Sequence, residues 1–198
     1  MPAGPVLSEV EKENIKKQLQ ILCTKHWIAK GYKKTSIKEL CEDTGISVGT
    51  FYNLYPAKED LFFATIDAIQ KRLEEQIFAI VQNTPTMIGF ANAIKAIVRE
   101  YDKMPFLYEA NSPDFLSFVT KLSEETMEKL KNDRINFLRN IIRMTNLELN
   151  VSEQEAQASI SALLSTIYAR ETISLACDYF KIFDFMVDSL IPNIFKER

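Results

Sequence analysis

Residues 35–54 have the sequence TSIKELCEDTGISVGTFYNL, and they give the clearest indication of the fold. Ser36 and Ser47 each stand where a short helix can begin, because a serine hydroxyl accepts the free N–H groups of a first helical turn. Glu39 completes a capping-box pattern with Ser36. Gly45 lies between the two apolar runs and permits a tight reversal. The pattern predicts a helix-turn-helix, with helices over 37 to about 43 and 48 to about 54.

The outer face of the second short helix is a candidate DNA-reading surface. Two short helices that cross steeply leave this face uncovered, and it has the width to enter a major groove. It carries no lysine or arginine, and the chain has no arginine before Arg72, so bidentate arginine readout of guanine is excluded here. Contacts to thymine methyl groups and asparagine pairing with adenine predict an A·T-weighted operator core. The residues expected on this face are Val48, Gly49, Thr50, Tyr52 and Asn53.

A longer helix is predicted upstream of this motif. Ser8 and Glu11 form a second capping box, after which apolar residues recur at helical spacing. Gly31 is expected to end this helix as a left-handed residue. The predicted buried stripe consists of Ile15, Leu19, Leu22 and His26.

Charge is distributed unevenly along the chain, whose formal net charge is −3. Residues 1–60 hold nine lysines and eight acidic residues. The part from Lys16 to Lys38 holds seven of those lysines and no acidic residue. Such a run suits phosphate binding, although it is also the ordinary composition of a solvated helix surface.

The N-terminal third resembles the DNA-binding domain of TetR/AcrR-type regulators over about residues 9–71. The resemblance implies an all-helical homodimeric repressor whose C-terminal domain binds a small molecule and thereby releases a palindromic operator on double-stranded DNA. It rests on Gly31-Tyr32, Thr35-Ser36-Ile37, the run Thr44 to Tyr52, and the run Tyr55 to Leu61.

The same resemblance implies particular DNA contacts. Thr35 and Ser36 would meet a phosphate at the start of the first short helix, where free N–H groups and the helix dipole favour anions. Lys58 matches a frequent phosphate-contacting position. The remaining positions carried over are Ser47, Thr50, Tyr52 and Tyr55, and core packing is the alternative role for the Tyr55 ring.

The chain beyond this region predicts further helices and a division into two domains. Residues 1–57, with a tail over 1–8, are expected to form the DNA-binding domain, and 58–198 a larger helical domain for effector binding and dimerisation. The last two helices are implied to form a four-helix bundle with their copies in a partner subunit. The expected helices run from 58 to 83, from 87 to about 101, from beyond 113 to about 144 with a possible new start at 123, from 152 to about 168, and through 194, with a loop over 146–150.

Aromatic residues gather around a segment bracketed by Pro105 and Pro113. Most such residues form core, but broken helices permit movement and aromatic walls suit apolar ligands. A pocket for a small hydrophobic effector is therefore predicted among Tyr101, Phe106, Tyr108, Phe115, Phe137 and Tyr168.

Composition argues against an enzyme. The single histidine, His26, is expected in the core, and the three widely spaced cysteines form no zinc pattern, so neither a metal nor a cofactor is expected. Phosphate-binding and nucleophile motifs are absent from the sequence. No apolar run approaches the roughly 20 residues of a membrane span, and the first residues lack a signal-peptide pattern, which favours a cytoplasmic protein. The alternative function is a small-molecule-binding helical module that no longer binds an operator.

Overall fold

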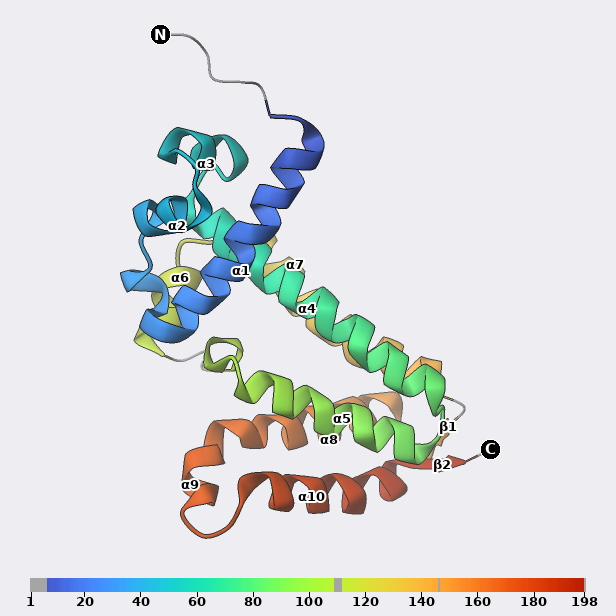
Figure 1. Ribbon diagram of the computed structural model, residues 1–198. Coiled ribbons are helices and arrows are strands. Elements are labelled where there is room, and N and C mark those ends of the chain that lie inside the picture. The colour runs from blue at the N-terminus through green and yellow to red at the C-terminus, as the bar shows by residue number, and fades with distance from the viewer. Residues whose placement is uncertain (1–6, 109–111, 146, 198) are drawn as a thin grey trace, which may run out of the picture. The chain divides into compact units, whose positions relative to one another are not determined.

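The computed structural model describes residues 7–108, 112–145 and 147–197, and this part of the chain is helical apart from two short strands (Figure 1). The predicted all-α architecture is therefore confirmed. The elements are α1 (Glu9–Lys34), α2 (Ile37–Thr44), α3 (Val48–Leu54), α4 (Lys58–Asn83), α5 (Met87–Asp102), η1 (Pro105–Leu107), α6 (Pro113–Val119), α7 (Glu124–Met144), β1 (Leu147–Leu149), α8 (Glu153–Ser165), η2 (Thr166–Ala169), α9 (Arg170–Ser174), α10 (Tyr179–Ile194) and β2 (Phe195–Glu197).

The chain folds into two compact units, and their boundary lies inside α4. The N-terminal unit comprises the chain up to Gln70 together with α6 and the residues through Leu122. The C-terminal unit comprises the chain from Lys71 through η1, and from Ser123 onward. The helix-turn-helix thus shares its unit with a segment that is more than forty residues further along the chain. Most of the tail expected over residues 1–8 lies outside the described residues.

The buried face of α1 differs from the predicted stripe. Leu19, Cys23 and Trp27 are buried, and Trp27 packs against α4 and α6. His26 was expected in the core, but its Nε2 lies 2.9 Å from Oδ2 of Asp43 near the end of α2. Leu19 is buried as predicted, but the buried row then continues through Cys23 and Trp27, each one position later than the predicted Leu22 and His26. The sequence does not specify which of these two adjacent rows faces the interior.

Gly31 and Asp114 join α1 to α6. Gly31 has φ +80° and ψ 170°, so it has a positive φ as predicted but lies outside the left-handed helical region. The Asp114 carboxylate accepts the backbone N–H groups of Tyr32 at 2.6 Å and Lys33 at 3.0 Å. A Cβ atom at Gly31 would lie 2.8 Å from Oδ2 of Asp114. The position therefore requires glycine both for its backbone conformation and for the close carboxylate.

Replacing Gly31 by alanine is expected to lower the free energy of unfolding by about 2–3 kcal/mol, because this φ/ψ region is essentially restricted to glycine. Gly45→Ala is the matched control: Gly45 also has a positive φ, of 74°, but a Cβ atom added there would meet no other atom within 4 Å, and its cost is expected near 1 kcal/mol. Denaturant unfolding of both variants measures the difference. Equal losses would contradict the expectation that the backbone conformation of Gly31 and the close Asp114 carboxylate together make its replacement more costly.

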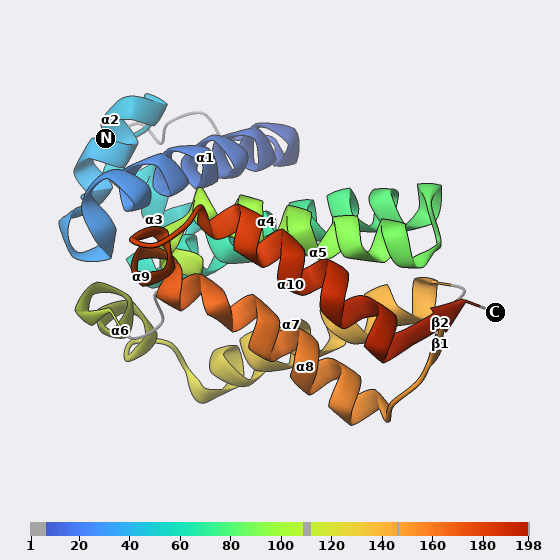
Figure 2. The ribbon, with the colours of Figure 1, turned by 90° about the horizontal axis from the view of Figure 1, so that it is seen from below.

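The C-terminal unit has a core in which α5, α8 and α10 pack together (Figure 2). Phe90 and Ile94 of α5 and Phe183 and Val187 of α10 are almost fully buried. Arg99 of α5 adds an ion pair with Asp184 of α10 at 2.7 Å. No helix in the described residues is long and apolar enough to cross a membrane.

Two features of this unit differ from the sequence prediction. A third feature decides whether a new helix begins at Ser123, which the sequence left open. The segment expected as a loop contains β1, which pairs antiparallel with β2, with Glu148 opposite Lys196. The helix expected through Tyr168 ends at Ser165 and continues as η2. Ser123 does begin a new helix, because its hydroxyl accepts the N–H of Thr126.

Candidate nucleic-acid interface

The turn between α2 and α3 has the geometry that the sequence predicts. Gly45 adopts φ 74° and ψ 28°, and the N–H of Ile46 donates to the Cys41 carbonyl at 3.0 Å. Cys41 and Phe51 are buried on the inner faces of the two helices. A small side chain at Cys41 and a left-handed glycine therefore allow α3 to cross α2 closely and keep its outer face uncovered.

The outer face of α3 is exposed and polar at its start. Ser47 caps the helix by accepting the N–H of Thr50 at 3.0 Å, and the two hydroxyl groups are 2.9 Å apart. Val48 is 43% exposed and Tyr52 49% exposed, although the Tyr52 ring packs edge-on against Phe51. Of the predicted contact residues, those exposed on this helix and its cap are Ser47, Val48, Gly49, Tyr52 and Asn53, while Thr50 is half-buried.

The two hydroxyl groups predicted to meet a phosphate at the start of α2, those of Thr35 and Ser36, differ in burial and in hydrogen bonding. Thr35 is 2% exposed, and its Oγ1 donates to the Gly31 carbonyl at 2.7 Å. Ser36 is half-buried and makes no side-chain capping bond, so the predicted capping box with Glu39 is wrong at the serine hydroxyl. Glu39 pairs with Lys30 of α1 in addition to its hydrogen bond with the Ser36 backbone. The Ser36 hydroxyl thus remains available for another acceptor or donor.

Tyr55 and Lys58 are both engaged within the N-terminal unit. The Tyr55 ring is buried, its hydroxyl accepts a hydrogen bond from Gln20 at 3.1 Å, and burial raises the pKa of this hydroxyl. Lys58 donates to the carbonyl of Tyr32 at 2.6 Å and lies 4.3 Å from the centre of the Tyr32 ring. Burial lowers the pKa of Lys58. In this conformation both side chains stabilise the unit rather than face solvent.

Tyr32 is the centre of a polar cluster that the sequence did not indicate. Its hydroxyl donates to Glu59, and Lys121 beyond α6 lies 3.0 Å from that hydroxyl and 3.1 Å from the Glu59 carboxylate. Burial and the bond to Glu59 raise the pKa of Tyr32. Burial opposes ionisation of Glu59, but hydrogen bonds from Tyr32 and Lys121 outweigh it and lower its pKa. The cluster fastens α4 and the end of α6 to the residues before α2.

Exposed lysines flank the helix-turn-helix. Lys33 and Lys34 lie directly before the start of α2, and both are exposed. Other lysines of the acid-free run are partly neutralised, since Lys16 pairs with Glu13 at 3.0 Å. The lysine count predicted a positive surface here but did not identify which lysines remain exposed beside α2.

The six aromatic residues predicted to form an effector pocket are not all brought together. Tyr108 and Tyr168 meet with ring centres 6.2 Å apart, while Phe137 packs against Phe78 at 6.4 Å. Tyr101 is half-buried and Phe106 is buried, both in the C-terminal unit. Phe115 belongs to the N-terminal unit, where its ring stacks 6.4 Å from Trp27.

Within the described residues, no group of three or more histidine, cysteine or acidic side chains is arranged to hold a metal ion. Cys23 and Cys41 are buried, and burial raises the pKa of the Cys23 thiol to about 12. Cys23 therefore remains protonated at neutral pH and is a core residue of α1.

Residues 24–65, which span the end of α1 through the start of α4, match the model for bacterial regulatory proteins of the tetR family. Among curated proteins, no sequence matches the chain.

Several solved structures share the fold. FadR of Bacillus subtilis, a transcriptional regulator solved with stearoyl-CoA, is 13% identical, with 90% of this chain and 98% of FadR aligned at a TM-score of 0.65. AlkX, a TetR family repressor of Dietzia sp. strain DQ12-45-1b, is 14% identical, with 89% and 93% aligned at 0.56. NalD, a repressor of the MexAB-OprM efflux pump in Pseudomonas aeruginosa, is 12% identical, with 96% and 100% aligned at 0.56. Identities this low show a common fold alone.

Proposed function

Because the chain is a TetR-family transcriptional regulator, we propose that it is a homodimeric repressor that binds a palindromic operator and is released by a small-molecule effector. The observation that carries this proposal is the uncovered outer face of α3 above a well-formed helix-turn-helix. In this proposal residues 1–57 bind DNA, and residues 58–198 bind the effector and dimerise. The protein acts without enzymatic activity, in the cytoplasm.

The proposed DNA contacts divide into reading and positioning residues. The base edges are contacted from α3 by Val48, Gly49, Thr50, Tyr52 and Asn53. The absence of arginine from this helix favours an A·T-weighted operator core. Phosphates are held by Ser36, Ser47 and the α2 N-terminus, with Thr35 supporting that turn from within. Tyr55 contributes through its packing beneath α3. Lys58 reaches a phosphate only by leaving the Tyr32 carbonyl.

A salt titration of operator binding tests the proposal. Changing both Lys33 and Lys34 to glutamine is expected to make the slope of log affinity against log salt shallower by about three to four, because a dimer loses four charges at about 0.9 each. Lys103→Gln, an exposed lysine directly after α5 in the other unit, is the matched control and leaves the slope unchanged. Lys58→Gln reports its own role, since only a phosphate contact changes the slope. Absent or salt-insensitive binding would refute the repressor.

Dimerisation is proposed to use α8 and α10. These helices lie side by side (Figure 2), and both carry exposed apolar residues. Ala158 and Ala162 of α8 are exposed, and Phe185 of α10 is 69% exposed. Two copies of such a face form a four-helix bundle. Two recognition helices held one DNA turn apart then read a palindrome jointly.

Phe185→Lys is expected to raise the dimer dissociation constant at least about 100-fold, because symmetry places the loss of a buried phenylalanine in the interface twice. Sedimentation equilibrium measures this constant. Ile21→Lys on α1 is the control, because Ile21 is also 69% exposed but lies in the other unit. If both variants remain equally dimeric, Phe185 is outside the interface.

The effector site is proposed among the aromatic residues of the C-terminal unit, namely Tyr101, Phe106, Tyr108, Phe137 and Tyr168. FadR, which shares the fold, was solved with stearoyl-CoA, and this supports an apolar effector. Effector screening with Phe106→Ala and Tyr108→Ala tests the site, and an unchanged response in both variants would move it elsewhere. Phe115 keeps a core role beside Trp27.

The second candidate function is that of a small-molecule-binding helical module that does not bind an operator. The lack of lysine and arginine on α3 favours it, because such a helix binds DNA weakly. The salt titration separates the two functions, since the module retains its ligand and its dimer but shows no specific DNA binding.

A further inference from the structure

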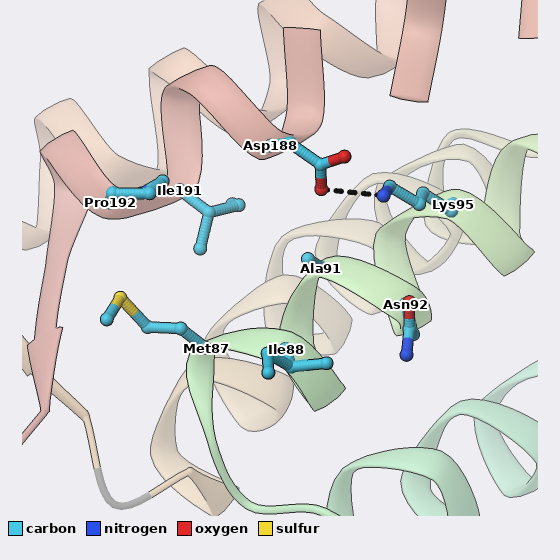
Figure 3. Close-up of a pocket in the computed structure, with 8 residues that line it drawn as sticks. All are labelled: Met87, Ile88, Ala91, Asn92, Lys95, Asp188, Ile191 and Pro192. Atoms are coloured by element: carbon cyan, nitrogen blue, oxygen red, sulfur yellow. Dashed lines mark hydrogen bonds and ion pairs between the residues drawn. The ribbon is translucent and has the colours of Figure 1, made fainter. Parts of the chain in front are cut away.

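A groove between α5 and α10 has no part in the proposed operator or aromatic sites. Figure 3 shows Ala91 of α5 and Ile191 of α10 at its floor, both buried. Met87 and Ile88 of α5 and Pro192 of α10 form its sides. Its volume is about 430 Å³, within the range of roughly 300–1,000 Å³ typical of small-molecule sites.

One end of the groove carries a single ion pair. Nζ of Lys95 lies 2.6 Å from Oδ1 of Asp188 (Figure 3). The two partners differ in burial, since the Lys95 side chain is 18% exposed and the Asp188 side chain 59% exposed. Asp188 can therefore turn into water at little cost, whereas Lys95 without a counter-charge would remain a half-buried cation.

We propose that this groove binds an alkyl carboxylate, with the ligand carboxylate on Lys95 in place of Asp188 and the alkyl chain over Ala91 and Ile191. The ligand head group repeats the chemistry of the side chain that it displaces, so Lys95 keeps a charge-assisted hydrogen bond. An alkyl amine is disfavoured, because it would have to displace Lys95, the more buried partner. Carboxylate binding here requires neither operator binding nor the aromatic effector site.

The lining also selects the shape of the tail. It contains no aromatic ring. Apart from Asn92, Lys95 and Asp188 it is formed by aliphatic carbon and the thioether of Met87, which adapts readily to a flexible chain. Ile88 is 69% exposed, so a chain lying beside it removes apolar surface from water. A chain of medium length fits the volume, and the groove is open along its outer side.

Isothermal titration of the full-length protein with octanoate tests the proposal. One saturable site per chain is expected, with octanol and octylamine binding at least about tenfold more weakly, because neither supplies an anion to Lys95. Affinity is expected to rise about two- to fourfold per added methylene from hexanoate to decanoate. Non-saturable uptake, or equal binding of the three head groups, would overturn the proposal.

Two substitutions are expected to act in opposite directions. Lys95→Gln weakens octanoate binding about tenfold, while Asp188→Asn strengthens it about two- to fivefold by removing the competing carboxylate. A gain in affinity cannot come from misfolding, so the second variant keeps the test valid if the first is unstable. Arg99→Gln is the matched control, because Arg99 pairs with Asp184 between the same two helices, one turn away. Octanoate affinity unchanged in both Lys95→Gln and Asp188→Asn would place the ligand elsewhere and contradict the inference.

Two further measurements distinguish the carboxylate site from a subunit interface and from the operator-binding function. If Lys95→Gln dissociates the dimer in sedimentation experiments, a second copy of the chain covers the groove, and the inference fails. Operator binding is titrated on the same samples without octanoate. Its failure would remove the proposed repressor while leaving the carboxylate site intact, and the reverse result would remove only the site.

Discussion

Replacing Asn53 by alanine is expected to weaken binding to the operator by at least about thirtyfold. An asparagine that pairs with both edge groups of adenine contributes about 1–3 kcal/mol of discrimination, and a symmetric dimer uses it twice, which gives about 2–6 kcal/mol. Asn53 is exposed on α3, so its removal leaves the core of the N-terminal unit unchanged. Fluorescence anisotropy with the oligonucleotide selected by the protein measures the loss.

Binding of the same variant to a duplex of scrambled sequence shows whether Asn53 reads a base. Affinity for a scrambled duplex is expected to stay the same, because phosphate contacts carry no sequence information. Asn14→Ala is the matched control, since Asn14 is an exposed asparagine on α1. Equal losses on both duplexes would mean that Asn53 positions the helix without reading a base, and no loss at all would remove it from the interface.

Phe62→Ala is expected to destabilise the N-terminal unit by about 3–5 kcal/mol, the range for removing a buried phenylalanine. The Phe62 side chain is fully buried, and its ring centre lies 4.6 Å from that of Trp27, 5.0 Å from that of Tyr32 and 6.1 Å from that of Phe118. Its removal leaves a cavity where α1, α4 and α6 meet. Operator binding is expected to fall with the population of folded unit.

Trp27 fluorescence during denaturant unfolding measures this loss directly, because Trp27 is the chain's single tryptophan and contacts Phe62. Ile21→Ala in α1 is the control: Ile21 is 69% exposed, and the change is expected to stay within about 0.5 kcal/mol. An unchanged midpoint for Phe62→Ala would show that the surrounding rings close over the vacated space.

The helix-turn-helix could be predicted from the sequence because its determinants are local. Gly45, Ser47 and the small Cys41 fix the turn within a few residues of one another, and the structure confirms the bounds of α2 and α3 closely. The reading face of α3 follows from the same short pattern. Its proposed DNA contacts stay predictions until binding is measured.

Other features depend on residues far apart in the chain and could not be found in this way. Asp114 meets Tyr32 across more than eighty positions, and no periodicity indicates that pairing. Lys58 has a partner in the Tyr32 carbonyl that the sequence does not show. β1 and β2 are each only three residues long, and they pair across more than forty positions of the chain.

The attachment of α6 to α1 limits how regulators of this kind can be recombined. A chimera that joins residues 1–70 to the ligand-binding half of another regulator discards Asp114 and Phe118, which complete the N-terminal unit. The backbone N–H groups of Tyr32 and Lys33 then lose their acceptor, and the Trp27 ring loses a neighbour. A working hybrid must therefore carry residues 112–122 from the same parent, so the smallest exchangeable module is discontinuous in the gene.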